Sequence, residues 1–236
     1  MGEEILLSID TTSSDVARAA VEAGVNMVND VSGGVADSKM TRTVADLNVP
    51  YVQSSFCYLL TRVTHTNPYR YVMMHRRGDT KTMTTEKSKT YVDVVRDVGD
   101  ELKICADEAQ SSGIPLWNLM MDPGVGFSKT PEQSMQLLRN LGSFSPYPLL
   151  VGASRKRFLA HTVGRPDCSS PEDRDGAGAA LSAVLAYIAS EKQDMSLAAL
   201  RVHNVGMTSD AIAMARSLVI SDDDDDDDDD DDGDSL

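Results

Sequence analysis

Single polar or charged side chains close one apolar run of the sequence after another. Asp10, Asn29 and Asp122 each stand at the end of such a run. Carboxylate and amide oxygens in a dry pocket can accept hydrogen bonds from ring N–H donors of a neutral ligand, which compensates the loss of their hydration. A lone Asp at a strand end is also a common helix N-cap, and this alternative applies to Asp10 and Asp122.

Basic side chains close the last two apolar runs. Lys156 directly follows a strand end, although a surface lysine in a basic turn is the alternative. Arg201 and His203 alternate around Val202, so we expect both on one side of a strand. A forked Arg donor beside a second donor suits an anionic group, and this pairing argues against a merely buried histidine.

Short apolar runs separated by helical stretches predict the elements that position these residues. Such runs are typical of buried parallel strands, and six successive βα units indicate an α/β protein. We favour a barrel over an open doubly wound sheet, because a polar residue ends nearly every strand rather than only those at a switch point. The expected strands are 5–9, 25–29, 49–52, a run that resumes at 71, 117–121, 148–152 and 199–203.

The helices are expected between these strands. Thr130-Pro131-Glu132-Gln133 combines an N-cap, a first-turn proline and a capping box, and it predicts a helix start. The expected helices are 14–23 ended by Gly24, 37–47, 85–110, 130–141, 176–190 and 209–218.

Composition indicates one globular domain over 1–220, followed by an acidic tail over 221–236. The net charge of −15 is dominated by twelve tail aspartates, without which 25 acidic residues face 22 basic ones. The nearly neutral domain gives no indication of nucleic-acid or membrane binding. Three widely spaced cysteines are expected to be reduced thiols of an intracellular protein.

Six motifs occur in one order and together resemble dihydropteroate synthase, a pterin-binding enzyme. The features Asn204 and Gly113-Ile114-Pro115 are most similar to the eukaryotic branch of that family. The motifs are Ser8-Ile9-Asp10-Thr11, Asn29-Asp30-Val31-Ser32-Gly33-Gly34, Met74-His75, Asp122-Pro123-Gly124-Val125-Gly126-Phe127-Ser128-Lys129, Gly152-Ala153-Ser154-Arg155-Lys156-Arg157-Phe158 and Arg201-Val202-His203-Asn204-Val205.

The resemblance implies a (β/α)8 TIM-barrel transferase of folate biosynthesis. The family joins 6-hydroxymethyl-7,8-dihydropterin pyrophosphate to para-aminobenzoate, with magnesium (Mg2+) assisting, and releases pyrophosphate. The implied pterin ligands are Asp10, Asn29, Asp122 and Lys156. The implied pyrophosphate anchors are Arg201 and His203, which with Lys156 form the expected catalytic set. Para-aminobenzoate is expected near Phe127, Arg155 and Arg157, although many relatives have Ser at the last position.

Two departures from the family shape the expectation for this chain. The motifs of the first two family strands are missing, so about six of eight βα units are expected. The family's magnesium-binding Asn lies in the first of them, so no metal ligand is predicted here. Residues 53–72 interrupt a strand between Val52 and Met73, and the Tyr-Val pair recurs at both ends. We interpret 53–72 as a retained untranslated segment, with a surface insertion as the alternative.

Three interpretations of function therefore remain. The first is dihydropteroate synthase, the second a non-catalytic or incomplete pterin-binding fragment, and the third a pterin-dependent methyltransferase domain. The Lys156 and Arg201 motifs place the methyltransferase last. Small-molecule substrates are the expected partners, a homodimer is an open option, and the compartment is either cytoplasmic or mitochondrial.

Overall fold

Strands and helices alternate along the chain. The computed structural model describes residues 7–32, 36–47, 49, 51–54, 71–78, 82, 85–111, 116, 119–167, 170–192 and 195–218. The elements in chain order are β1 Ser8–Asp10, α1 Ser14–Glu22, β2 Met27–Asp30, α2 Met40–Leu47, β3 Tyr51–Ser54, β4 Tyr71–Met74, the 3-10 helix η1 Glu86–Lys89, α3 Val94–Ser111, β5 Leu119–Asp122, α4 Pro131–Arg139, η3 Leu141–Phe144, β6 Leu149–Val151, α5 Arg157–Thr162, η4 Glu172–Arg174, α6 Asp175–Glu191, β7 Leu197–Leu200 and α7 Val205–Ser217.

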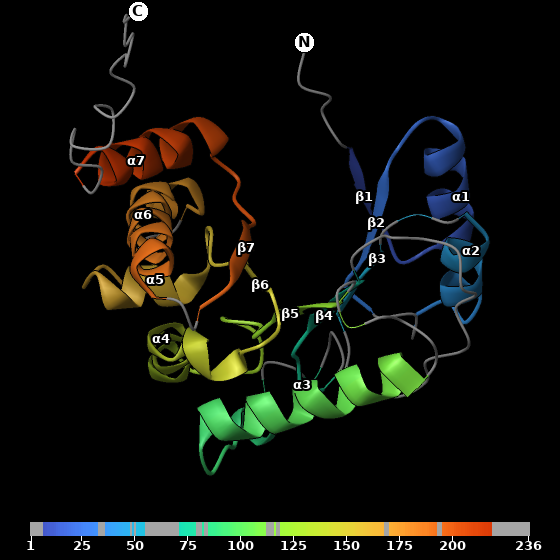
Figure 1. Cartoon of the computed structure of the whole chain (residues 1–236), viewed down its shortest axis with the longest axis horizontal. Coiled ribbons are helices and arrows are strands. Elements are labelled where there is room, and N and C mark those ends of the chain that lie inside the picture. The colour runs from blue at the N-terminus through green and yellow to red at the C-terminus, as the bar shows by residue number, and fades with distance from the viewer. Residues whose placement is uncertain are drawn as a thin grey trace, which may run out of the picture.

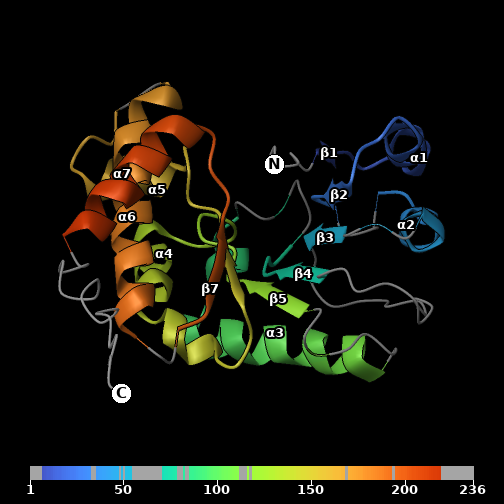
Figure 2. The same cartoon turned by 45° about the horizontal axis from the view of Figure 1, so that its top comes forward.

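The seven strands form one parallel sheet in the order β1-β2-β3-β4-β5-β6-β7. The sheet curves, and the helices lie around its outside, with α1 and α2 at one end, α3 below, and α4 to α7 at the other end (Figures 1 and 2). A doubly wound sheet would reverse its strand order at a switch point, whereas this order never reverses. The α/β barrel-type prediction is therefore confirmed as a curled half-barrel, whose edges among the described strands are β1 and β7.

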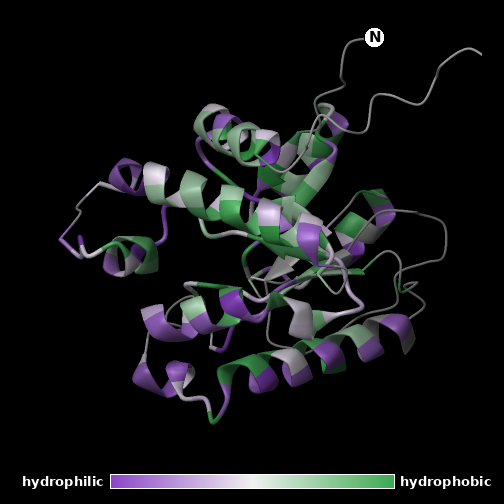
Figure 3. Cartoon of the chain, turned by 60° about the vertical axis from the view of Figure 1, so that its left-hand side comes forward, coloured by the Kyte–Doolittle hydropathy of each residue, from purple (hydrophilic) through white to green (hydrophobic). Residues whose placement is uncertain are grey.

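The core lies where the central strands meet the helices. All four residues of β5 are buried, and α3 buries Val94, Val98, Leu102 and Ala106, which recur every fourth residue along one face. Hydrophobic and hydrophilic residues accordingly alternate along α3 in Figure 3. Burial of this stripe fixes α3 beneath β4 and β5.

Local signals set several helix ends as predicted. The Thr130 hydroxyl accepts from the Gln133 backbone N–H at 3.2 Å, and the Gln133 side chain accepts from the Thr130 N–H at 2.9 Å. Gly24 follows α1 with a φ of 105°, which favours glycine. The expected helix over 85–110 instead divides into η1 and α3, because Asp93 accepts from the Val95 and Arg96 N–H groups and starts a new helix.

The sheet has seven strands rather than the expected six. We predicted one strand interrupted between Val52 and Met73, but β3 and β4 are separate neighbours in the sheet. They pair in parallel with Val52 opposite Val72. Residues 55–70 lie outside the described part of the chain, so the insertion remains a prediction, as does the acidic tail over 221–236.

The structure also bears on the cysteines and on membrane association. Cys105 is disulfide-bonded, so the expectation of a reduced thiol at that position is wrong. Within the described residues, no helix combines the length and the apolar character needed to cross a membrane.

Candidate active site at the carboxyl edge of the sheet

Asp122 is a buried carboxylate at the end of β5, with 2% of its surface exposed. Its Oδ1 accepts the Gly124 N–H at 2.8 Å. Burial raises the pKa of Asp122, while the positive charges of Lys156, Arg201 and Lys129 act in the opposite direction. The Asp122 side chain is therefore a hydrogen-bond acceptor, and three cationic side chains from different segments favour its charged form.

The loop after Asp122 has a conformation that requires glycine. Gly124 has a φ of 65°, and a Cβ there would lie 1.9 Å from the His75 carbonyl oxygen. The His75 N–H in turn donates to the Asp122 carbonyl at 2.8 Å. Close packing against the end of β4 thus determines the path of residues 123–128.

Lys156 joins the loop after β6 to the loop after β5. Its Nζ donates to the Val125 carbonyl at 2.5 Å and lies 4.1 Å from the centre of the Phe127 ring. Burial lowers the pKa of Lys156 to about 8, although the nearby Asp122 carboxylate favours the protonated form. The structure therefore brings Lys156 close to both Asp122 and Phe127, with the cation over an aromatic face.

Arg201 and His203 reach the same edge by contacts other than those predicted. We expected both on one strand, but β7 ends at Leu200 and both side chains are exposed beyond it. The Arg201 guanidinium packs on Gly152, where an added Cβ would lie 3.0 Å from Nε. The His203 N–H donates to Ser154 Oγ at 3.2 Å, and Nδ1 lies 3.0 Å from the same oxygen.

Asp10 and Asn29 lie opposite each other on β1 and β2. Asp10 is exposed and Asn29 is buried. The N-cap alternative does not hold for either predicted aspartate, because Ser13 is the N-cap of α1 and Thr130 that of α4. Pterin binding by Asp10 and Asn29 stays a prediction.

The two arginines predicted near para-aminobenzoate are not part of the central cluster. Arg155 donates to both carboxylate oxygens of Asp175 at 2.8 and 3.0 Å, and to Glu172 at 3.0 Å. Arg157 is exposed at the start of α5. Of the three residues predicted to contact para-aminobenzoate, Phe127 is the one whose side chain lies against the Lys156 ammonium.

A polar network beneath the loop, in which His75 and Lys129 are buried, was not predicted. His75 Nε2 lies 2.7 Å from Glu101 Oε2, and its Nδ1 lies 2.9 Å from Lys129 Nζ. Burial and the Lys129 charge lower the pKa of His75 to about 4, and burial lowers that of Lys129 to about 7. Burial would raise the pKa of Glu101, but hydrogen bonds from His75 and Arg77 outweigh it and lower the value to about 2.

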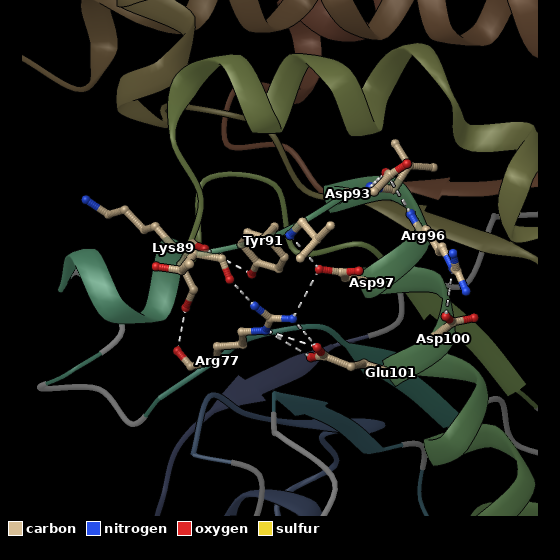
Figure 4. Close-up of polar contacts among 12 residues, drawn as sticks. Arg77, Lys89, Tyr91, Asp93, Arg96, Asp97, Asp100 and Glu101 are labelled. Atoms are coloured by element: carbon tan, nitrogen blue, oxygen red, sulfur yellow. Dashed lines mark hydrogen bonds and ion pairs between the residues drawn. The ribbon is translucent and has the colours of Figure 1, made fainter.

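The network continues outward from Glu101. Arg77 donates to Glu101 and lies 3.9 Å over the Tyr91 ring (Figure 4). His75 and Lys129 stand in two of the sequence motifs, so the motifs were a usable signal for them. Glu101 stands 26 residues after His75 within a helix, and no motif marks it.

A family model described as "Pterin binding enzyme" matches residues 1–203. The chain belongs to this family. Among its relatives, the mitochondrial folate synthesis bifunctional protein of Arabidopsis thaliana is 36% identical over 92% of this chain and 36% of its own length. The dihydropteroate synthase of Streptococcus pyogenes is 32% identical over 92% of this chain and 68% of its own. The resemblance predicted from the motifs is confirmed.

Solved structures of dihydropteroate synthases are also similar to this chain. The Xanthomonas albilineans dihydropteroate synthase in complex with 7,8-dihydropteroate has a TM-score of 0.66 and 31% identity, covering 92% of this chain and 70% of that one. The Thermus thermophilus enzyme in complex with 6HMPPP has a TM-score of 0.65 and 29% identity, with 91% and 73% covered. The chain spans 36%, 40% and 38% of three plant folate synthesis proteins that it matches.

Proposed function

We propose that the chain performs the dihydropteroate synthase reaction, joining 6-hydroxymethyl-7,8-dihydropterin pyrophosphate to para-aminobenzoate. The observation that carries the proposal is the buried carboxylate of Asp122. Burial raises its pKa, and the positive charges of Lys156 and Arg201, on two further loops, lie close enough to oppose that rise. A similar solved enzyme is in complex with 7,8-dihydropteroate, the product of that reaction.

The pterin would bind over the central cluster. Asp122 would accept hydrogen bonds from adjacent ring N–H donors, with Asn29 and Asp10 contributing further acceptors from β2 and β1. Lys156 would face the carbonyl side of the ring, and its charge would balance the carboxylates. Because Asp122 is already desolvated, its hydrogen bonds to the ring would not first require the removal of water.

The leaving group would lie toward β7. Arg201 and His203 would donate to the pyrophosphate oxygens as the bond between the pterin methylene carbon and the bridging oxygen breaks. The arylamine nitrogen would then bond to that carbon and lose a proton. An amine of low basicity needs no strong general base, and Phe127, Arg155 and Arg157 are the proposed contacts for para-aminobenzoate.

A magnesium ion is implied by the family resemblance. The described residues contain no group of three or more His, Cys, Asp and Glu side chains that could hold a metal ion. No step above depends on a resident metal ion. Magnesium would enter the assay as a component to be varied.

Turnover of the chain tests the proposal. Dihydropteroate formation would be followed with both substrates and magnesium, using Lys156→Ala as the variant and Lys103→Ala, an exposed α3 position, as its control. Turnover lost only in Lys156→Ala supports the proposal. Folded wild-type protein that binds pterin without turnover would instead support the second candidate, a non-catalytic pterin-binding chain. Among the described strands, β1 and β7 lie at the edges of the sheet.

We infer a homodimer from the exposed apolar side chains on α6 and α7. Val184 and Met214 are 53% and 65% exposed, and sedimentation of Met214→Glu tests the assembly.

A cytoplasmic or mitochondrial location, supported by the mitochondrial plant relative, is testable by fluorescent fusion. We also propose that 53–72 is a retained segment. A transcript lacking those codons would support that proposal, and a messenger containing them throughout would contradict it.

A further inference from the structure

Lys129 is a buried ammonium with three acceptors. Its Nζ lies 2.9 Å from His75 Nδ1, 3.0 Å from the Phe127 carbonyl and 3.2 Å from the Gly124 carbonyl. Only 6% of the residue is exposed, so water does not replace these partners. The three N–H donors of a protonated lysine match the three acceptors.

The partners of His75 define the protonation of the group. Glu101 is a carboxylate that only accepts, so Nε2 of His75 must carry a proton toward it. Either His75 is neutral and Lys129 charged, or His75 is charged and Lys129 neutral. The pKa of His75 is lowered to about 4 and that of Lys129 to about 7, so Lys129 keeps the proton and His75 is neutral with Nδ1 as an acceptor.

We propose that Lys129, oriented by His75, is a positioning residue for the pterin pocket. The two carbonyls that it holds, those of Gly124 and Phe127, bracket Val125, whose own carbonyl holds Lys156. The same short loop begins at Asp122. One ammonium beneath the loop thus sets the relative positions of Asp122, Phe127 and Lys156, the three groups proposed to surround the substrates.

The outer end of the network keeps His75 in place. Glu101 accepts from His75. It also accepts from Arg77, which lies over Tyr91 (Figure 4). The Tyr91 hydroxyl donates to the Ser128 carbonyl at 3.0 Å, one residue before Lys129. Lys129 and Tyr91 therefore both contact the loop. Each is linked to Glu101 of α3, Lys129 through His75 and Tyr91 through Arg77.

Two substitutions at one position separate the contacts of His75. The amide oxygen in His75→Asn approximates Nδ1 and retains an acceptor for Lys129, while the donor to Glu101 is lost. The amide nitrogen in His75→Gln approximates Nε2 and retains a donor for Glu101, while the acceptor for Lys129 is lost. Lys129→Met removes the ammonium at similar volume, and Lys103→Met, at the exposed α3 position, is its control.

The inference rests on the proposed function, but its test needs no turnover. Binding of 6-hydroxymethyl-7,8-dihydropterin pyrophosphate would be measured by calorimetry, and amide exchange would be measured over residues 123–128. We expect Lys129→Met and His75→Gln to weaken binding at least tenfold and to speed exchange, with His75→Asn within threefold of wild type and Lys103→Met unchanged.

Other outcomes overturn the inference. Equal losses in His75→Asn and His75→Gln would show that burial of the ring, not its contact with Lys129, matters. Faster exchange with unchanged affinity would leave Lys129 a merely structural group. Wild-type protein that binds this pterin but forms no product would overturn the proposed reaction alone, because the affinity comparison among the variants would still decide the role of Lys129.

Discussion

The centre of the sheet and its two edges hold their functional groups in different ways. At the centre, Asp122 is buried at the end of β5, and the loop behind it is fixed by backbone packing and by Lys129. At the edges, Asp10 on β1 and Arg201 beyond β7 are exposed. Central groups are therefore preorganised by the fold, whereas edge groups keep their hydration until a ligand or another surface covers them.

This difference assigns separate roles to the two regions. Electrostatic interactions are stronger where water is excluded, so the centre should dominate recognition of a neutral ring. The edges should respond more to salt and contribute less to folding stability. The changes below test that division, beginning with the largest expected effect.

A glycine pair gives the strongest contrast. Gly124→Ala should destabilise the fold by more than about 2 kcal/mol, because the new Cβ meets a backbone oxygen at 1.9 Å in a positive-φ conformation. Gly99→Ala, within α3 and with nothing within 4 Å of the new Cβ, should instead stabilise by about 0.5–1 kcal/mol. Urea denaturation measures both. Equal effects at the two positions would contradict a rigid central loop.

Acid should weaken the centre through His75. Its pKa is lowered from 6.5 to about 4 in the folded chain, so the unfolded state binds more protons between those values. The contribution of His75 to the free energy of unfolding should therefore be constant above pH 6.5. It should fall by about 3 kcal/mol as the pH drops to 4. Denaturation across this window measures the slope. His75→Gln should remove that contribution, and a slope that persists in the variant would assign it to another group.

One substitution at two sites compares centre and edge directly. Asp122→Asn should weaken pterin binding by about one to two orders of magnitude, because a buried charge-assisted acceptor is lost beside Lys156. Asp10→Asn should weaken it by less than about threefold and leave stability within about 0.5 kcal/mol, since the side chain is exposed. Calorimetry ranks the two variants, and the reverse ranking would refute the division.

The smallest expected effect lies beside β7. Ser154→Ala removes the hydroxyl that contacts both the N–H and Nδ1 of His203. Stability should change by less than about 0.5 kcal/mol because His203 is exposed, while kcat should fall severalfold. Ser154→Thr, which retains the hydroxyl, should recover most of the rate. A stability loss of several kcal/mol would show that this edge is as tightly packed as the centre.

Much of the fold and part of the site could be predicted from the sequence because the decisive signals are local. Apolar runs located the strands, and Thr130 with Gln133 fixed the start of α4. Asp122 and Lys156 follow strands directly, so parallel pairing brings their loops together. The same argument does not tell whether two similar runs form one strand or two. Tyr51-Val52 and Tyr71-Val72 lie on two neighbouring strands, β3 and β4, and not on the single strand that we predicted.

The parts that were not predicted depend on packing between distant segments. Glu101 meets His75 only because α3 lies beneath β4, and helical periodicity gives no indication of that partner. Arg155 donates to both carboxylate oxygens of Asp175, which stands 20 residues later in the sequence, and no local pattern indicates this partner. Charge type and strand-end position are visible in a sequence, whereas the choice among available partners is a property of the folded chain.

The unbroken order of the sheet has a consequence for how the chain acquires its structure. Every described strand pairs only with strands adjacent to it along the chain, so each pairing closes a limited loop. Folds dominated by such short-range pairings tend to form faster than those that must join distant ends. A chain leaving the ribosome could add strands one at a time from β1 toward β7, with the α6 and α7 layer packing last.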